Sequence, residues 1–212
     1  AIIEKIKSKL PTSFINIGGV SNISFWNGNK LIGFDVGPGN ALIDAFVKKR
    51  LNLNFDNGGK IASAGLPNKS VIKKFLNDKY FTKQYPKSLD KFYFDYIFND
   101  NVFKSLNTFD AACTLTHLTV QSIIVALDQL PEMNETLIIS GGGQHNKYLI
   151  KELKNNIGSK ILTSNELNIP GDMIEAEMMA YLTARSVRKL KYTFPDTTGT
   201  KKPCTGGDLF FP

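Results

Sequence analysis

The sequence predicts an α/β fold, and three features carry this prediction. An Asn-Gly hairpin spans residues 15–35, a long amphipathic helix covers 110–130, and two short strands at 136–140 and 160–163 flank a helical segment. Strands that alternate with helices in this way are typical of α/β domains. The chain has 212 residues, of which 42% are hydrophobic and 21% charged, so it can bury the core of one large domain or two small ones.

The hairpin is the stretch around which the other elements are organised. A short strand at 15–17 leads into Gly18-Gly19, apolar positions alternate from Val20 to Trp26, and a second strand returns over 30–35. Asn27-Gly28-Asn29 supplies the turn, because Asn and Gly tolerate the positive φ angles that tight hairpins require. We therefore expect two strands folded back on each other.

A carboxylate and two glycine turns lie at the ends of these strands. Gly18-Gly19 follows the first strand, and Asp35 comes just before Gly37-Pro38-Gly39. Exposed backbone N–H groups at glycine turns can hold a polyphosphate while a nearby carboxylate moves a proton. A plain glycine-rich hairpin with a solvated aspartate has the same spacing, so both interpretations stay open here.

Two helices and a loop are predicted around the hairpin. Residues 2–10 predict a short helix that ends before a proline. Asn40 is expected to cap a helix over 41–51, with Asp44 near its positive end. The stretch 55–65, rich in glycine and small residues, is expected to form a loop.

An aromatic-rich segment follows, and we expect residues 66–105 to form a helical and loop insertion. Pro67 opens a predicted helix that runs to about Asn77. The aromatic residues at 80–103 favour a satellite core, with a sugar-stacking platform as the alternative. The polar stretch 86–92, PKSLDKF, interrupts this apolar region and would need polar partners, such as a ligand.

Two ionisable side chains fall on the predicted helix at 110–130. His117 is interpreted as a structural histidine with its hydrogen bonds satisfied, and Cys113 lies on the apolar face. Together with Cys204, Cys113 gives neither metal-ligand spacing nor a disulfide framework. Free thiols indicate a cytoplasmic compartment.

The strand at 136–140 runs into Gly141-Gly142-Gly143, and a helix is expected over 144–157. Three absent side chains let a ligand approach the backbone, and the following helix N-terminus would offer unpaired N–H groups. The pattern is neither a P-loop nor a dinucleotide fingerprint. A tight strand-to-helix turn is the structural alternative, but such a turn rarely needs three glycines.

The last long helix is expected to open at Gly171 and to end in the basic run 185–191. Asp172 and Glu175 would lie in its first turn, where carboxylates commonly stabilise the helix dipole. The same spacing also places both carboxylates on one side of the helix, as catalysis could require. Spacing alone does not choose between these roles.

The charge pattern bears on the partners of the chain. Its 26 Lys and Arg residues exceed the 19 Asp and Glu residues, giving a net charge of +7. The basic residues are scattered and lack the arginine–aromatic interleaving of RNA-binding segments, so we expect no nucleic-acid partner. No apolar run approaches the ~18 residues of a membrane span, so we expect no membrane partner.

A series of stretches carries a family resemblance, in order from Asn16 to Gly207: NIGGVSNIS, GFDVGPGNALID, FDNGGKIASAG, PKSLDKF, DAACTLTHLTVQSI, SGGGQHNKYL, GDMIEAEMMAYLTAR and PDTTGTKKPCTGG. Together they resemble the anhydro-N-acetylmuramic acid kinases of the sugar kinase/Hsp70/actin superfamily. The resemblance covers nearly the whole chain. It implies an actin-like ATPase (ribonuclease H-like) lobe, whose mixed central sheet is flanked by helices.

The resemblance also implies a reaction. ATP would phosphorylate O6 of 1,6-anhydro-N-acetylmuramic acid while water opens the anhydro ring, giving N-acetylmuramic acid 6-phosphate for cell-wall recycling. Mg²⁺ would bridge the phosphate oxygens. The alternatives are another sugar or acyl kinase of the same superfamily, and a non-catalytic nucleotide-binding module.

Site residues follow from the resemblance motif by motif. Asp35 of FDVGPGN resembles the base that activates the water, and Glu175 of MIEAEMMAY the carboxylate that supports it across the site. Gly18 and Gly19 resemble the second phosphate loop, and Gly141, Gly142 and Gly143 the adenosine-side turn. Sugar or site-shaping contacts are implied for the remaining candidates, Asn40, Lys87 and Ser88. No residue is assigned to a metal.

One departure from the family pattern concerns the first phosphate loop. Family members begin with a lobe that carries a GxMSGTSxDGxD loop and a DFR-like segment, and neither occurs here. We therefore expect residues 1–212 to be the C-terminal lobe of a two-lobe kinase, inactive without the missing N-terminal lobe. The expected partners are that lobe, ATP and the amino sugar, and a homodimer is compatible with them.

Overall fold

The computed structural model describes residues 7–169, 174–208 and 210. The helix expected at 2–10 lies mostly outside the described residues, and its described end, residues 7–10, forms a turn and no helix. Gly171 and Asp172, expected at the opening of the last helix, also lie outside them.

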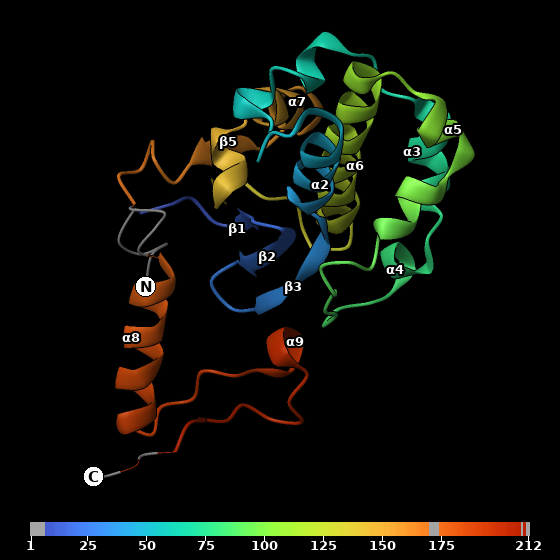
Figure 1. Ribbon diagram of the computed structural model, residues 1–212. Helices are drawn as coiled ribbons and strands as arrows, with labels where there is room; N and C mark the ends of the chain where they lie inside the picture. Colours follow the sequence, from blue (N-terminus) through green and yellow to red (C-terminus); the bar gives the residue numbers. More distant parts are fainter. Residues whose placement is uncertain (1–6, 170–173, 209, 211–212) are drawn as a thin grey trace.

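The strands form one mixed sheet in the order β3-β2-β1-β4-β5 (Figure 1). Their bounds are β1 (Thr12–Ile17), β2 (Val20–Trp26), β3 (Leu31–Pro38), β4 (Thr136–Ser140) and β5 (Lys160–Thr163). β2 is antiparallel to both of its neighbours, β1 and β3, whereas β4 is parallel to β1 and β5 is parallel to β4. β1, β3, β4 and β5 therefore run in the same direction, and their carboxyl ends meet at one edge of the sheet.

The alternation of side chains along the strands builds the first core. Ile15 pairs with Ile23 across β1 and β2, and both are buried. With other apolar residues of the sheet they pack against Ile123 of α6 and Leu153 of α7. Because successive strand residues face opposite sides, one apolar face is covered by helices.

Helices flank the sheet, and Figure 1 shows α2, α6 and α7 gathered beside it, with α3, α4 and α5 further out. The bounds are α2 (Ala41–Leu51), α3 (Lys69–Leu76), α4 (Lys79–Thr82), α5 (Asn101–Ser105), α6 (Thr108–Asp128), α7 (Lys147–Asn156), α8 (Ile174–Val187) and α9 (Pro195–Thr198). Short 3₁₀ turns are η1 (Asn57–Gly59), η2 (Ala62–Ala64), η3 (Asp95–Asn99) and η4 (Gly142–His145). The expected mixed sheet flanked by helices is confirmed.

The helix boundaries follow their caps. α2 has the bounds predicted for it, whereas α3 begins at Lys69, because the Asn68 side chain accepts hydrogen bonds from two backbone N–H groups of the first turn. α7 begins at Lys147 and not at 144, because Asn146 caps it in the same way. The triple glycine is therefore followed by the 3₁₀ turn η4 and not directly by an α-helix.

The aromatic segment forms a second core against α2 and α6. Phe75 and Phe94 have ring centroids 4.6 Å apart, and both rings are buried. Phe81 packs with them, while Phe46 of α2 packs on Phe103. The satellite core favoured by the sequence is thus present.

α6 is the central helix that both cores share. By length and composition it could cross a membrane, with a mean hydropathy of 1.3, but 67% of that stretch is buried inside the protein. The sequence predicts no apolar run long enough to span a membrane. That prediction is wrong, because α6 has the length and the composition of a membrane span. The apolar character serves the packing of a core helix, which is buried on more than one side.

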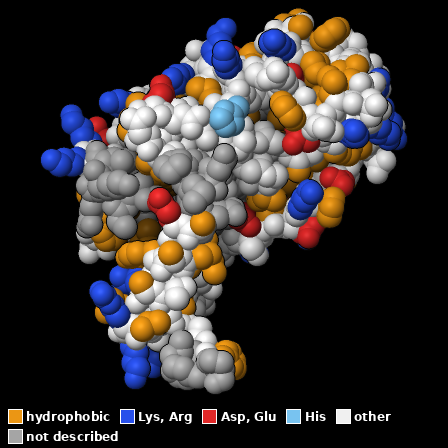
Figure 2. All heavy atoms as spheres, turned by 60° about the vertical axis from the view of Figure 1, so that its left-hand side comes forward, with side chains coloured by type: hydrophobic (Ala, Val, Ile, Leu, Met, Phe, Trp, Pro, Cys, Tyr) orange, Lys and Arg blue, Asp and Glu red, His pale blue; other side chains and the backbone are white. Residues whose placement is uncertain are grey.

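The C-terminal arm, residues 174–208, extends away from the sheet (Figure 1). α9 returns to β3, where Thr197 lies beside Gly33 and Lys30 pairs with Asp196 at 3.3 Å. Figure 2 shows apolar side chains interspersed with basic ones along the arm. The exposed large apolar residues described in α8 and the turn after it are Met178, Met179, Tyr181, Val187 and Leu190.

Candidate functional site

Three glycine turns lie at the carboxyl edge of the sheet. Gly18-Gly19 follows β1, Gly39 follows β3, and Gly141 follows β4. The carboxyl ends of parallel strands are the usual place for ligands in open α/β sheets. The strand directions therefore bring together turns that are far apart in the sequence.

The turn after β3 is joined to the turn after β1 by backbone hydrogen bonds. Gly39 N–H donates to the Gly19 carbonyl at 2.9 Å, and Asn40 N–H donates to the Gly18 carbonyl at 2.7 Å. A Cβ on Gly39 would lie 2.2 Å from the Gly18 carbonyl oxygen, so only glycine fits there. The Thr119 hydroxyl of α6 donates to the Gly39 carbonyl at 2.8 Å and anchors this contact to the core.

Asn40 does not cap α2 with its side chain, contrary to the sequence prediction. Its Nδ2 donates instead to the carbonyl of Ile17 at the end of β1, at 3.1 Å. This tertiary contact replaces the local cap, because the end of β1 presents a carbonyl within reach. Asn40 therefore shapes the corner between β1 and α2.

The triple glycine completes this edge. Gly141 has a φ of 75°, and a Cβ there would lie 2.4 Å from Asn16 Oδ1 and 2.8 Å from the Ile17 carbonyl oxygen. A Cβ on Gly143 would meet the Ile17 side chain at 2.4 Å, whereas Gly142 is exposed. A Cβ on Gly142 would lie 3.5 Å from Asn40 Nδ2. The structure thus brings together the glycine candidates and Asn40.

Asp35 lies on β3, near the end of the strand, and its carboxylate is half-buried. Oδ2 accepts a hydrogen bond from the Leu89 N–H at 2.8 Å. Within the parts of the chain described, this N–H is the one hydrogen-bond donor to the Asp35 carboxylate. Burial raises the pKa of the Asp35 carboxyl, and the Leu89 N–H opposes part of that rise.

Lys87 and Ser88 lie in the segment that contacts Asp35, but their side chains point to different surroundings. The Lys87 ammonium is enclosed and donates to the Tyr80 carbonyl and to Gln129 Oε1, so it does not face a substrate. Ser88 is exposed. The sugar contact suggested by the sequence stays a prediction for Ser88, whose side chain is accessible.

Glu175 belongs to α8, whose described part begins at Ile174. The surroundings of its side chain lie outside what the structure describes. Its role across the site from Asp35 stays a prediction.

Sequence reasoning missed several residues that support this site. The Tyr80 hydroxyl donates to the Asp35 carbonyl at 2.6 Å, from a segment interpreted as an aromatic core or a sugar-stacking platform. Thr119 could have been recognised from the sequence, because a threonine within the apolar stripe of a helix must find a hydrogen-bond partner. Leu89 acts through its backbone N–H, which no side-chain pattern reveals.

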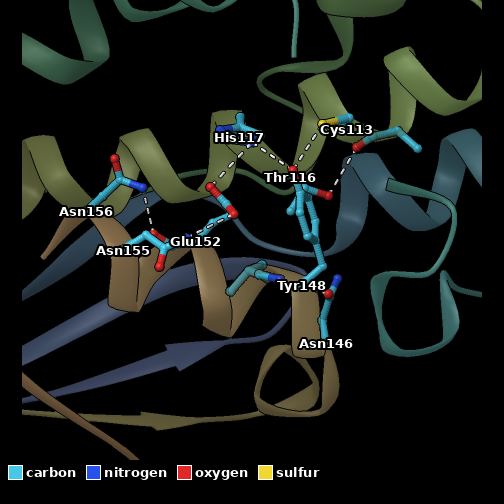
Figure 3. A network of polar contacts seen from close by, with 10 residues as sticks. Cys113, Thr116, His117, Asn146, Tyr148, Glu152, Asn155 and Asn156 are labelled. Atoms are coloured by element: carbon cyan, nitrogen blue, oxygen red, sulfur yellow. Dashed lines mark hydrogen bonds and ion pairs between the residues drawn. The ribbon is translucent and has the colours of Figure 1, made fainter. Parts of the chain in front are cut away.

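A second polar network lies between α6 and α7 (Figure 3). The Tyr148 hydroxyl lies 3.1 Å from His117 Nε2 and 3.3 Å from Cys113 Sγ. His117 also lies 3.8 Å from the Glu152 carboxylate, and burial lowers its pKa. Nε2 of His117 thus has polar partners within the fold, as the structural interpretation of this histidine expects.

The residues described contain no group of three His, Cys, Asp or Glu side chains placed to hold a metal ion. Gly19 and Gly142 are exposed at the glycine corner, whereas Gly39 is buried and both of its backbone groups are bonded within the protein. Exposed backbone at the first and third turns is compatible with binding of a phosphate chain. Asp35 stands on the strand that leads into this corner. The arrangement therefore offers exposed glycine backbone at one edge of the sheet and, on a strand that ends at this edge, a half-buried carboxylate.

The sheet order, with β2 antiparallel to both of its neighbours, defines the fold class: this is a mixed five-stranded α/β lobe of the ribonuclease H-like kind. The sequence profile of one family, described as anhydro-N-acetylmuramic acid kinase, matches residues 3–212. The chain belongs to that family.

Curated relatives agree with this assignment. An anhydro-N-acetylmuramic acid kinase of Mesorhizobium japonicum is 38% identical over 196 residues, which are 92% of this chain and 52% of the relative. Its counterpart in Brucella anthropi is 37% identical over 210 residues, 99% of this chain and 56% of the relative. The chain spans about half the length of the curated relatives it matches.

Among solved structures, one similar chain is the activator of the 2-hydroxyisocaproyl-CoA dehydratase from Clostridium difficile with bound ADPNP. It is 12% identical, with a TM-score of 0.49 over 87% of this chain and 66% of that chain.

Proposed function

We propose that this chain carries the base and one phosphate-binding edge of a kinase that converts 1,6-anhydro-N-acetylmuramic acid to N-acetylmuramic acid 6-phosphate. The observation that carries the proposal is the position of Asp35 on β3, because the turn that follows this strand at Gly39 is hydrogen-bonded to Gly18-Gly19. The Leu89 N–H is the one donor described for the Asp35 carboxylate. Family membership supplies the substrate class.

The reaction balances with one base. Water adds to C1 of the sugar, the C1–O6 bond breaks, and O6 takes the γ-phosphoryl group of ATP. Asp35 accepts the proton that the water loses, and ADP leaves. A raised pKa suits a general base, because its proton affinity lies closer to neutral pH.

The remaining candidates are proposed in supporting roles. The turns at Gly18-Gly19 and Gly141–Gly143 would bind the phosphates and the adenosine side of ATP through backbone groups. Glu175 would support the water from across the site, and Ser88 would contact the sugar. Mg²⁺ would be held mainly by the phosphate oxygens of ATP.

We also propose the domain arrangement and the cellular compartment in which the chain acts. The chain would act as the C-terminal lobe of a two-lobe kinase, with residues 66–105 as an insertion and a further segment supplying the first phosphate loop. Cys113 and Cys204 are free thiols, which suits a cytoplasmic enzyme. A homodimer stays a prediction.

The test compares this chain with a chimera, in which the N-terminal part of the Mesorhizobium relative precedes it. Each protein is incubated with ATP, Mg²⁺ and one acceptor: 1,6-anhydro-N-acetylmuramic acid, N-acetylglucosamine or acetate. We expect ADP release only from the chimera with the anhydro sugar. In ¹⁸O-labelled water, mass spectrometry should find one ¹⁸O in the sugar product, at the C1 hydroxyl.

The other outcomes separate the alternatives. Turnover with acetate or N-acetylglucosamine but not with the anhydro sugar would assign another sugar or acyl kinase. Nucleotide binding without any turnover would favour the non-catalytic module.

A further inference from the structure

Lys87 is a buried lysine that no step of the proposed reaction uses. Its side chain is 6% exposed. The ammonium donates hydrogen bonds to the Tyr80 carbonyl at 3.2 Å and to Gln129 Oε1 at 3.1 Å. It also lies 4.8 Å from the centre of the Tyr80 ring and 5.4 Å from that of Phe34. A cation in this position contacts β3, α4 and the end of α6 together.

The backbone of the same residue pairs with β3. Asp35 N–H donates to the Lys87 carbonyl at 3.0 Å, and Leu89 N–H donates to Asp35 Oδ2 at 2.8 Å. Residues 87–89 therefore lie along the edge of β3 and supply the one donor described for the Asp35 carboxylate. If this segment moves, the carboxylate loses its orientation.

The hydrogen bonds between these residues form a closed ring. The Tyr80 hydroxyl donates to the Asp35 carbonyl at 2.6 Å, while the Tyr80 carbonyl accepts from the Lys87 ammonium. Asp35, Lys87 and Tyr80 are thus linked in a ring of hydrogen bonds. Gln129 is fixed in turn, because its Nε2 donates to the Phe81 carbonyl at 2.5 Å.

An enclosed ammonium is costly, and that cost argues for a role. Burial lowers the pKa of Lys87 to about 8, with a smaller contribution from the charge of Lys83. An apolar side chain of similar length would fill the space between the Phe34 and Tyr80 rings without this cost. What it would not provide is the pair of hydrogen bonds that joins the segment to α4 and α6.

We propose that Lys87 is a positioning residue, which anchors residues 87–89 through its ammonium so that the Leu89 N–H orients the Asp35 carboxylate. The part of this inference that concerns catalysis rests on the proposed function of Asp35. The anchoring itself is a property of the fold.

The first experiment measures the anchor without using activity. Amide hydrogen exchange is followed by NMR in the wild-type chain, in Lys87→Met and in Lys83→Met, which removes a nearby exposed ammonium. We expect the Asp35 and Leu89 amides to exchange at least about tenfold faster in Lys87→Met, with the centre of α6 unchanged. Lys83→Met should leave all of these rates unchanged.

The second experiment uses kinetics in the chimera described above. Lys87→Met should lower kcat about ten- to hundredfold with little change in KM for the sugar. The acidic limb of the pH profile of kcat should move to higher pH, because loss of the Leu89 hydrogen bond removes the interaction that lowers the pKa of Asp35. Lys87→Arg, which keeps a cation, should restore part of kcat.

Several results would overturn the proposal. Unchanged exchange at Asp35 and Leu89, or a uniform acceleration over the whole chain, would make Lys87 a merely structural residue. If Lys87→Met does not fold, Gln129→Met removes one acceptor of the ammonium and should accelerate the same two amides to a smaller extent; no acceleration there would also contradict the anchor. Local acceleration in a chimera without kinase activity would uphold the anchor and refute the proposed function.

Discussion

Two half-buried carboxylates, Asp35 and Asp44, differ in what surrounds them. Both carboxyls have a pKa raised by burial, that of Asp44 to about 6. Asp35 receives one backbone N–H and stands where β3 approaches the glycine turns. Asp44 lies in the first turn of α2 and has no side-chain hydrogen bond in the portion of the chain described.

The nearby Asp56 carboxylate accounts for part of the difference between the surroundings of Asp44 and Asp35. The negative charge of Asp56 adds to the burial effect and raises the pKa of Asp44 further. Asp56 is itself 5% exposed and accepts from the N–H groups of Ile61 and Ala62, both at 2.9 Å. Burial without a described donor thus makes Asp44 a source of instability. Asp35 is buried with one donor, the Leu89 N–H, which offsets part of the burial effect and suits the role of base that we propose for it.

The largest expected effect is the loss of turnover when Asp35 is replaced. In the chimera, Asp35→Asn should lower kcat by about 10²- to 10⁴-fold, the usual range for loss of a general base. Nucleotide affinity, measured by calorimetry, should change little, because the glycine turns that we propose to bind the nucleotide would do so through backbone groups. The matched change Asp44→Asn should leave kcat unaltered, and equal losses in the two variants would abolish the distinction between these carboxylates.

Asp56→Ala should have the next largest effect, on stability. It leaves the Ile61 and Ala62 N–H groups without their acceptor, which should cost about 2–3 kcal/mol of unfolding free energy. For a chain of this length the melting temperature should fall by roughly 5–10 °C. Asp56→Asn keeps one acceptor oxygen and should lose less. A melting temperature unchanged in Asp56→Ala would show that the loop at 55–65 does not depend on this carboxylate.

The sequence predicts those features of the molecule that depend on residues close together in the chain. The strands at 136–140 and 160–163 and the helix at 41–51 were predicted with the bounds observed, because side-chain periodicity and turn chemistry are properties of neighbouring residues. Asp35 became a candidate for the same reason, since it ends an apolar strand just before a glycine turn.

The rest depends on contacts between distant segments. Nothing near Lys87 in the sequence indicates that its ammonium turns inward to α6. The effect of Asp56 on Asp44 likewise arises only when the loop at 55–65 packs against α2. At Asn40 the local rule predicted a cap, and a tertiary contact with the end of β1 prevailed.

The smallest expected effect is a stability gain in Asp44→Asn that depends on pH. The pKa of Asp44 is about 6 in the folded protein and 3.8 as the ordinary value, so the folded state binds the proton more tightly. The stability that this proton contributes is present below about pH 4 and is lost as pH rises to about 6. At pH 7, Asp44→Asn should therefore be more stable by on the order of 1 kcal/mol, after allowance for solvent screening of a half-buried group. Urea unfolding of both proteins between pH 5 and 8 measures the difference, with Asp95→Asn as an exposed control. A gain that does not shrink toward pH 5, or one that Asp95→Asn reproduces, would mean that Asp44 carries no unfavourable charge and that the two carboxylates do not differ in the way described.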